Sequence, residues 1–429
     1  MHARNRRPFP GATVLKRIAV TDLCLGMHIH EFCGSWMEHP FWKAKFLLTE
    51  DKDLKRILDS GIEEVWIDAS KGRDVADGSA ALSQAEVAAE VDNLLVTEAQ
   101  APQKPISASL DDEVKRAQKL CARSKKAVVA MFGEVRMGQA INAEHVAELV
   151  EEIADSVARH PDAMISLARL KTCDEYTYMH SVAVCALMIA LARQLELTEE
   201  QVREAGVAGL LHDIGKMMIP DAILNKPGKL TDAEFTTVRQ HPEAGVRLLG
   251  VNQQVSDAVI DVCLHHHEKI DGSGYPHRLK GDEISLFAKM GAVCDVYDAI
   301  TSNRPYKAGW DPAESIRKMA EWSKGHFDQA VFQAFVKSVG IYPTGSLVRL
   351  ESGRLGLVMD QHPTSLLTPR VKVFFSAKSK TPIPQQIVDL SKLVGREKIV
   401  GREAPEDWNF PRLEELWSGL PTKNGSYFA

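Results

Sequence analysis

The sequence predicts a mainly α-helical protein with a small α/β module near its N-terminus and a short β extension near its C-terminus. Three patterns predict this class. Apolar residues recur at helical spacing almost throughout residues 110–340, residues 13–72 hold short apolar runs around one helical segment, and alternation replaces helical spacing after Pro343. With 429 residues, 45% of them hydrophobic, the chain can bury a substantial core and is long enough for two or three domains.

The first two parts of the chain differ in composition. Residues 13–72 are expected to form short strands and one helix over 51–60, which the glycine at position 61 ends. Residues 73–141 are expected to be a linker followed by a connecting helix. The linker, residues 73–109, is rich in Ala, Ser, Asp and Gln and contains a helical piece near 83–96.

The other two parts carry the main helical pattern and the change of period. Residues 142–340 are expected to form the helical domain, with loops at 217–230 and 268–286. Residues 341–429 are expected to supply the β extension and a loose tail over the last twenty residues. Strands are expected at 347–350, 356–359 and 371–375.

Composition excludes several classes of protein. A net charge of −6 argues against a polymeric nucleic acid as partner. The longest apolar run, 182–192, is too short to cross a bilayer, so no membrane span is expected. Residues 1–17 contain no apolar segment of a secretory signal, and seven cysteines without a CxxC pair fit a reducing compartment. We therefore expect a cytoplasmic protein.

Histidine is the residue type with the most informative distribution. Seven of the fifteen histidines lie between residues 180 and 277, roughly twice the share that an even spread would give. His180 shares a helical stripe with Val184 and Leu187, where a buried core histidine is the commoner role. His212 and Asp213 end an apolar helix, and two such side chains are costly to bury without a partner.

The remaining candidates also have structural alternatives when each is taken alone. His241 precedes Pro242 and is expected at a helix start, where it could simply be a cap. Three consecutive histidines, 265–267, end an apolar helix, and only two of them can converge because adjacent side chains diverge by about 100°. Asp295 continues an apolar stripe, where a cap or a buried salt bridge is the alternative.

Taken together, the candidates predict a metal site with five imidazoles, two carboxylates and no thiolate. They are His180, His212, Asp213, His241, His266, His267 and Asp295. This donor set suits two divalent ions that share a bridging carboxylate, with iron expected first and manganese or nickel as alternatives. Such a pair can clamp a phosphate for in-line attack by a metal-bridging hydroxide.

Groups that could hold a phosphate follow these residues in the sequence. Lys216 lies one turn after His212 and can place a point charge on a phosphate oxygen. Gly274 and Tyr275 belong to a turn-forming loop, where glycine allows close approach of backbone to a ligand. Arg304 and Lys307 could reach phosphates or a guanine edge, the alternative being exposed loop charges.

Three motifs resemble the HD-GYP subgroup of the HD hydrolase superfamily over roughly residues 142–340. They are His-Asp-Ile-Gly-Lys at 212–216, His-His-Glu-Lys-Ile-Asp-Gly-Ser-Gly-Tyr-Pro at 266–276, and Cys294 to Ala299 with Arg304-Pro305-Tyr306. The resemblance implies a helical metal-hydrolase bundle that hydrolyses cyclic di-GMP, a bacterial second messenger, to linear pGpG, with further cleavage to GMP left open. Residues 13–72 resemble an uncharacterised module that precedes such domains, in Gly34-Ser35-Trp36 and Pro40-Phe41-Trp42.

The resemblance also implies roles for individual residues. It makes the seven residues above the metal ligands, with Asp213 as the bridge and with Asp213 and Lys216 as catalytic residues. Lys216, Gly274, Tyr275, Arg304 and Lys307 become substrate contacts, and His265 has no counterpart. Relatives proposed to hold three metals carry Glu four residues before the first histidine, where this chain has Tyr176, so we expect a dinuclear site.

Other functions and partners stay open at this point. A nucleotide hydrolase acting on dNTPs or ppGpp would use the same fold. So would a receptor that binds the dinucleotide or a diguanylate cyclase without turnover, and so would a di-iron oxygenase. Diguanylate cyclases or other signalling proteins remain open as partners of the enzyme, and so does a homodimer.

Overall fold

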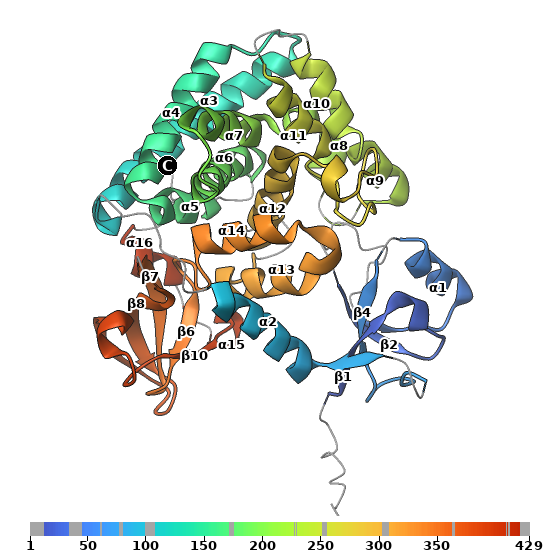
Figure 1. Ribbon diagram of the computed structural model, residues 1–429, viewed down its shortest axis with the longest axis vertical. Helices are drawn as coiled ribbons and strands as arrows, with labels where there is room; N and C mark the ends of the chain where they lie inside the picture. The colour runs from blue at the N-terminus through green and yellow to red at the C-terminus, as the bar shows by residue number, and fades with distance from the viewer. Residues whose placement is uncertain are drawn as a thin grey trace, which may run out of the picture. The chain divides into compact units, whose positions relative to one another are not determined.

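The computed structural model describes residues 13–33, 45–60, 62–76, 80–98, 108–170, 176–226, 228, 230–250, 255–302, 309–362, 365–408, 410 and 412–420. The chain divides into two compact units, residues 1–94 and 95–429, drawn in Figure 1. Helix α2 (Gln84–Glu98) begins in the first unit and ends in the second, within the segment expected to be a linker.

The N-terminal unit is a five-stranded antiparallel sheet with strand order β3-β2-β4-β1-β5. The strands are β1 (Leu15–Ala19), β2 (His28–Phe32), β3 (Phe46–Leu47), β4 (Glu64–Asp68) and β5 (Ala81–Ser83). Helix α1 (Asp51–Leu58) contributes Ile57 to a core that also contains Ile18, Ile29 and Ile67. The expected α/β character is confirmed. Strand β5, which pairs with β1, was expected to be linker because three residues are too few to show alternation.

The second unit is a helical bundle followed by a small sheet, as predicted. Its helices are α3 (Leu110–Arg136), α4 (Ala143–Arg159), α5 (Pro161–Arg169), α6 (Tyr176–Gln194), α7 (Glu199–Leu211), α8 (Asp221–Leu224), α9 (Asp232–Val238), α10 (His241–Leu249), α11 (Asp257–His265), α12 (Leu286–Thr301), α13 (Pro312–His326) and α14 (Gln329–Val339). A 3-10 turn (Ile214–Met218) and α8 occupy part of the expected loop at 217–230.

Helix α6 lies in the middle of the bundle (Figure 1), in contact with α3, α4, α5, α7, α12 and α14. Residues 179–192 are all buried, because a helix that is apolar on every side must be covered on every side. Gly209 lets α7 approach α6 closely: a Cβ there would lie 2.9 Å from the Cα of Cys185. This close packing sets the distance between His180 on α6 and His212 at the end of α7.

The C-terminal sheet has strand order β10-β6-β7-β8-β9 and is antiparallel throughout. Its strands are β6 (Leu347–Leu350), β7 (Arg354–His362), β8 (Ser365–Ser376), β9 (Thr381–Asp389) and β10 (Ile399–Arg402). The three predicted strands are present as β6, β7 and β8. Strand β9 escaped prediction because it lies at the sheet edge, is largely exposed and contains two prolines, which edges tolerate.

The expectation of a loose C-terminal tail is wrong for residues 412–420. After α15 (Pro405–Trp408), helix α16 (Leu413–Ser418) contacts β7 and buries Leu413 and Trp417, and Leu420 is buried just beyond it. Three apolar residues at helical spacing are too few to distinguish a docked helix from a tail. Residues 421–429 lie outside the described part of the chain.

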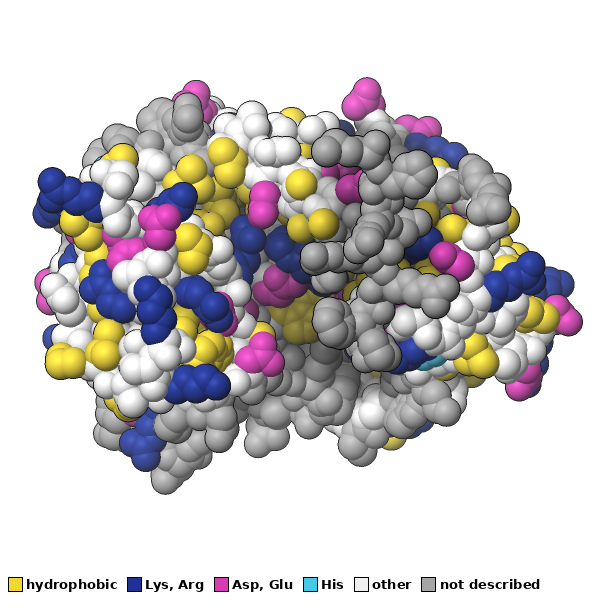
Figure 2. Space-filling view, turned by 90° about the horizontal axis from the view of Figure 1, so that it is seen from below, with side chains coloured by type: hydrophobic (Ala, Val, Ile, Leu, Met, Phe, Trp, Pro, Cys, Tyr) yellow, Lys and Arg dark blue, Asp and Glu magenta, His cyan; other side chains and the backbone are white. Residues whose placement is uncertain are grey.

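The surface mixes charges of both signs. On the face shown in Figure 2, Lys and Arg side chains lie among Asp, Glu and apolar side chains. This mixture agrees with the small net charge of −6. Among the described residues, none of the helices combines the length and apolar composition that crossing a bilayer requires.

Candidate metal centre

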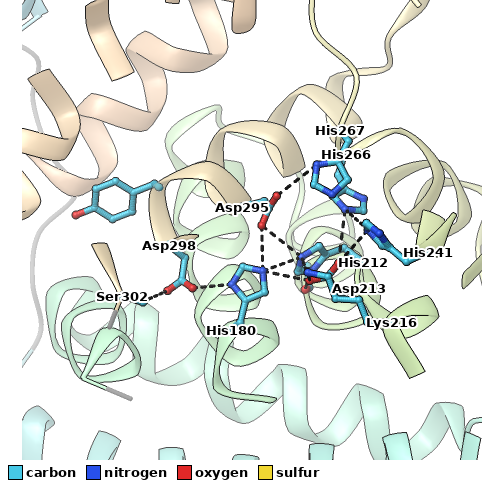
Figure 3. Close-up of polar contacts among 12 residues, drawn as sticks. His180, His212, Asp213, Lys216, His241, His266, His267, Asp295, Asp298 and Ser302 are labelled. Carbon is cyan, nitrogen blue, oxygen red and sulfur yellow. Dashed lines mark hydrogen bonds and ion pairs between the residues drawn. The ribbon is translucent and has the colours of Figure 1, made fainter. Parts of the chain in front are cut away.

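The ends of several helices and the middle of one bring the seven predicted ligands together (Figure 3). His180 comes from α6, His212 and Asp213 follow α7, and His241 begins α10. His266 and His267 follow α11, and Asp295 lies within α12. Six of the seven are buried, and His267 is half-buried with 12% of its side chain exposed. The expectations that His241 starts a helix and that His212 closes one are confirmed.

Four of the five histidines present the same ring nitrogen to the cluster. In each, Nδ1 lies at hydrogen-bonding distance from an oxygen outside the cluster, so that Nδ1–H donates outwards. The acceptors are Asp298 Oδ2 for His180 at 2.6 Å, and the carbonyls of Gly209 for His212 at 2.8 Å, Val238 for His241 at 2.7 Å and Val262 for His266 at 2.9 Å. A neutral imidazole with its proton on Nδ1 has its lone pair on Nε2. The four lone pairs therefore converge.

The two carboxylate oxygens of Asp213 face different histidines. Oδ2 lies 3.3 Å from Nε2 of both His180 and His212. Oδ1 lies 3.2 Å from Nε2 of His241 and 3.8 Å from Nε2 of His266. Asp213 thus belongs to two groups of potential metal ligands, one with His180 and His212 and the other with His241, His266 and His267.

Asp295 spans the cluster in the same sense. Its Oδ1 lies 3.0 Å from Nε2 of His180 and 3.8 Å from that of His212, while its Oδ2 lies 3.8 Å from Nδ1 of His267. His267 therefore turns the opposite ring nitrogen towards a carboxylate. Its ring stacks on that of Tyr275, with centroids 4.7 Å apart and planes 25° apart.

The arrangement of nitrogen and carboxylate donors is unfavourable without a cation. Nε2 of His180 lies 3.2 Å from Nε2 of His212, and Nε2 of His241 lies 3.3 Å from Nε2 of His266. Two lone pairs at this distance repel unless a positive charge lies near both. The buried Oδ1 of Asp213 and Oδ2 of Asp295 also have no hydrogen-bond donor. Buried polar atoms in this state carry a cost that a cation removes.

The pKa values of the histidines also reflect the absence of a cation from the cluster. Burial alone lowers the pKa of His212, but the Asp213 and Asp295 carboxylates overcome it and raise that pKa to about 10. Burial, with the positive charge of His212 nearby, lowers the pKa of His266 to about 3. In the absence of metal, protons therefore take up part of the charge balance at this site.

Two supporting carboxylates were not predicted. Asp298 accepts from His180 and also from the hydroxyl of Ser302, at 3.2 Å from Oδ1, and all three are buried. Glu268 accepts three backbone N–H groups, at positions 277–279, and thereby holds the loop after α11. Signals existed in the sequence: Asp298 lies one helical turn beyond Asp295, and Glu268 adjoins the histidine run.

The predicted substrate contacts have mixed surroundings. Lys216 is ion-paired with Asp213, so it adjoins the cluster. Tyr275 covers His267, and its ring faces the guanidinium of Arg239, 4.4 Å from the ring centroid. Gly274 is buried, and a Cβ there would lie 2.5 Å from the Cα of Glu268, so packing of the loop on itself explains this glycine.

Three positions of the prediction cannot be placed, and a fourth lies away from the cluster. Arg304, Lys307 and the side chain of Tyr176 lie outside the described residues. His265, which was given no role in the site, turns away from the cluster and lies near Asp261 and His277.

Comparison with known proteins identifies the family. Family models match a domain of unknown function, DUF3391, over residues 15–146 and an HD domain over residues 148–331. The cyclic di-GMP phosphodiesterase PA4108 of Pseudomonas aeruginosa is 62% identical over 416 residues, which cover 97% of this chain and 98% of the relative.

More distant relatives match shorter stretches of the chain. A cyclic di-GMP phosphodiesterase of Vibrio cholerae is 35% identical over 239 residues, half of this chain and 49% of the relative. The 3′3′-cGAMP-specific phosphodiesterase 1 of the same organism is 37% identical over 166 residues, 38% of each chain. The agreement with PA4108 over nearly the full length of both proteins decides the classification: the chain belongs to the family of HD-domain phosphodiesterases that carry a DUF3391 module ahead of the HD domain.

Proposed function

We propose that this protein hydrolyses cyclic di-GMP to linear pGpG, and more slowly to GMP, at a centre of two divalent metal ions. The observation that carries the proposal is the division of the ligands around Asp213, whose two oxygens face two separate groups of histidines. The substrate follows from the relatives, since PA4108, which matches 97% of this chain, is a cyclic di-GMP phosphodiesterase.

The residues present would hold two ions. One ion would be held by His180 and His212, the other by His241, His266 and His267, with Asp213 shared between them and Asp295 able to reach both groups. A site of imidazoles and carboxylates without thiolates suits iron, manganese or nickel. When bound, such ions would supply positive charge for the phosphate and make a water nucleophilic at neutral pH.

The chain's own side chains would orient the substrate. Lys216 is paired with Asp213 and half-buried, so its ammonium adjoins the cluster and would place positive charge on a phosphate oxygen bound there. Tyr275 stacks its ring on His267 beside the cluster, where we assign it to the substrate as well. We assign to Arg304 and Lys307 the second phosphate or a guanine edge. Asp298 would hold His180 in the orientation that points Nε2 inwards.

A centre of two ions has a consequence for the product. Position 176 is a tyrosine, and a phenol is a poor replacement for the bridging glutamate of the relatives proposed to hold three ions. A centre with one cation fewer offers less positive charge to the more highly charged linear product and would bind it less well. We therefore expect pGpG to accumulate before GMP appears.

The experiment is turnover of cyclic di-GMP by protein reconstituted with Fe(II) under anaerobic conditions or with Mn(II), with products separated by chromatography and bound metal counted. We expect two ions per chain, pGpG as the first product, and loss of both metal and turnover in Asp213→Asn. Asp221→Asn is the matched control, because it removes an exposed carboxylate that is paired with Arg136 outside the cluster, and it should keep both.

Several outcomes would overturn the proposal. Full activity in Asp213→Asn would contradict the assignment of the active site to this cluster. Three firmly bound ions per chain would contradict a dinuclear centre. Tight binding of cyclic di-GMP without turnover under any metal would make the protein a receptor. Faster hydrolysis of 3′3′-cGAMP, dNTPs or ppGpp in a substrate panel would replace the substrate.

A further inference from the structure

A second arrangement of histidines and a carboxylate lies outside the candidate centre. His265 is the last residue of α11, and its Nδ1 lies 2.6 Å from Oδ1 of Asp261, one turn earlier. Its Nε2 lies 2.9 Å from Nδ1 of His277, which stands in the loop that follows α11. The two rings are tilted by 57°, with centroids 5.2 Å apart.

This outer pair repeats two features of the inner cluster. Inside, the Nδ1 of His180 lies 2.6 Å from the carboxylate of Asp298, and the Nε2 of His180 lies 3.2 Å from a nitrogen of another imidazole. Outside, Asp261 and His277 occupy the corresponding places around His265. In both places a carboxylate fixes the proton on one ring nitrogen and leaves the other nitrogen facing a second ring.

We propose that His265 and His277 form a second, peripheral site for a divalent transition-metal ion such as Ni²⁺, Cu²⁺ or Zn²⁺. Imidazole is a suitable ligand for all three ions. Asp261 is itself held by the hydroxyl of Ser285, which donates to its other oxygen, so the carboxylate that orients His265 is fixed on both sides. His277 is exposed, so water would complete the coordination and the ion would exchange more readily than ions in the buried centre.

The loop that carries His277 also contacts residues beside the candidate metal centre. The backbone N–H of His277 donates to Glu268 at 2.6 Å, and Tyr275, two residues earlier, stacks on His267. An ion between His265 and His277 would fasten the loop to the end of α11. The proposal does not require the inner site to hold two ions or to hydrolyse any particular substrate.

The test is equilibrium dialysis of untagged full-length protein, carrying its resident metals, against Ni²⁺, with every metal counted in the same sample. We expect one additional Ni²⁺ per chain in the wild type and in His145→Asn, which removes an exposed histidine of α4. His277→Asn should lose this additional ion with its resident metals unchanged. Asp261→Asn should keep the ion with an affinity weakened by roughly 10- to 100-fold.

Two results would overturn the inference. One is an additional Ni²⁺ equivalent that survives in His277→Asn, and the other is wild-type protein that gains Ni²⁺ only by losing resident metal. A resident count other than two would contradict the proposed function and leave the outer site standing, so the two failures are distinguishable.

Discussion

Replacing Asp298 by asparagine tests whether the two halves of the centre are separate metal sites. Asp298 lies 2.6 Å from Nδ1 of His180, which belongs to one half of the centre. Asparagine keeps an oxygen that can accept the N–H but removes the negative charge. The expected result is weaker binding of the ion held by His180 and His212, with the ion held by His241 and His266 unaffected.

The magnitude follows from the kind of hydrogen bond that is lost. A buried hydrogen bond to a charged group contributes about 1.5–3 kcal/mol, and a tenfold change in affinity corresponds to about 1.4 kcal/mol. Removal of a carboxylate behind a ligating histidine lowers metal affinity by roughly 10- to 100-fold. We expect about tenfold for Asp298→Asn, since an acceptor remains, and up to about 100-fold for Asp298→Ala.

The assay is competition with a chelator, in which the metal retained per chain is counted as chelator concentration rises. The wild type should lose both ions over a narrow range of chelator concentration. Asp298→Asn should release one equivalent of metal at a lower chelator concentration and the second at the concentration at which the wild type releases its ions. Ser302→Ala removes one donor to Oδ1 of Asp298 but leaves the carboxylate and its contact with His180 in place, so it should shift the release of that ion less than Asp298→Asn does. Equal weakening of both ions, or of neither, would refute the division of ligands.

Three further predictions concern the loop, the fold and pH. Tyr275→Ala should lower kcat/KM for cyclic di-GMP by roughly 2- to 12-fold, because it removes an aromatic stack worth about 0.5–1.5 kcal/mol. Tyr275→Phe keeps the ring and should stay within about twofold of the wild type. Equal losses in the two variants would contradict a role for the ring. Gly215→Ala should lower the free energy of unfolding, measured in urea, by at least about 3 kcal/mol, because its Cβ would lie 1.9 Å from the carbonyl oxygen of His241. Gly133→Ala is the control: no atom lies within 4 Å of its Cβ, and the free energy of unfolding should rise by about 0.5–1 kcal/mol. Burial raises the pKa of Asp162 to about 7, so the folded protein keeps a proton that the unfolded chain releases near pH 4, and stability falls as pH rises from 4 to 7. Asp162→Asn should remove up to about 4 kcal/mol of that fall, and a variant with the same pH dependence as the wild type would contradict this assignment.

Some features could be predicted from neighbouring residues in the sequence, whereas others depend on contacts between distant elements. A polar side chain on an apolar helical stripe must be buried, so His180 and Asp295 could be placed inside the bundle from periodicity alone. The partner of His180 could not, because Asp298 lies 118 residues away and meets it only through the packing of α6 and α12. Edge strand β9 and helix α16 escaped for a related reason: neither carries enough local periodicity to reveal where it docks.

The sequence by itself determined the helical class, the two flanking β-containing parts and the set of histidines and carboxylates that had to be buried. Spacing decides which face of an element is apolar, and this information is local. Only the tertiary structure decided which ring nitrogen each histidine turns inwards, that the oxygens of Asp213 face two groups, and that His265 turns outwards to His277. These are distances between residues on different elements, and they are set by how closely the helices pack, as the glycine contacts between α6 and α7 show.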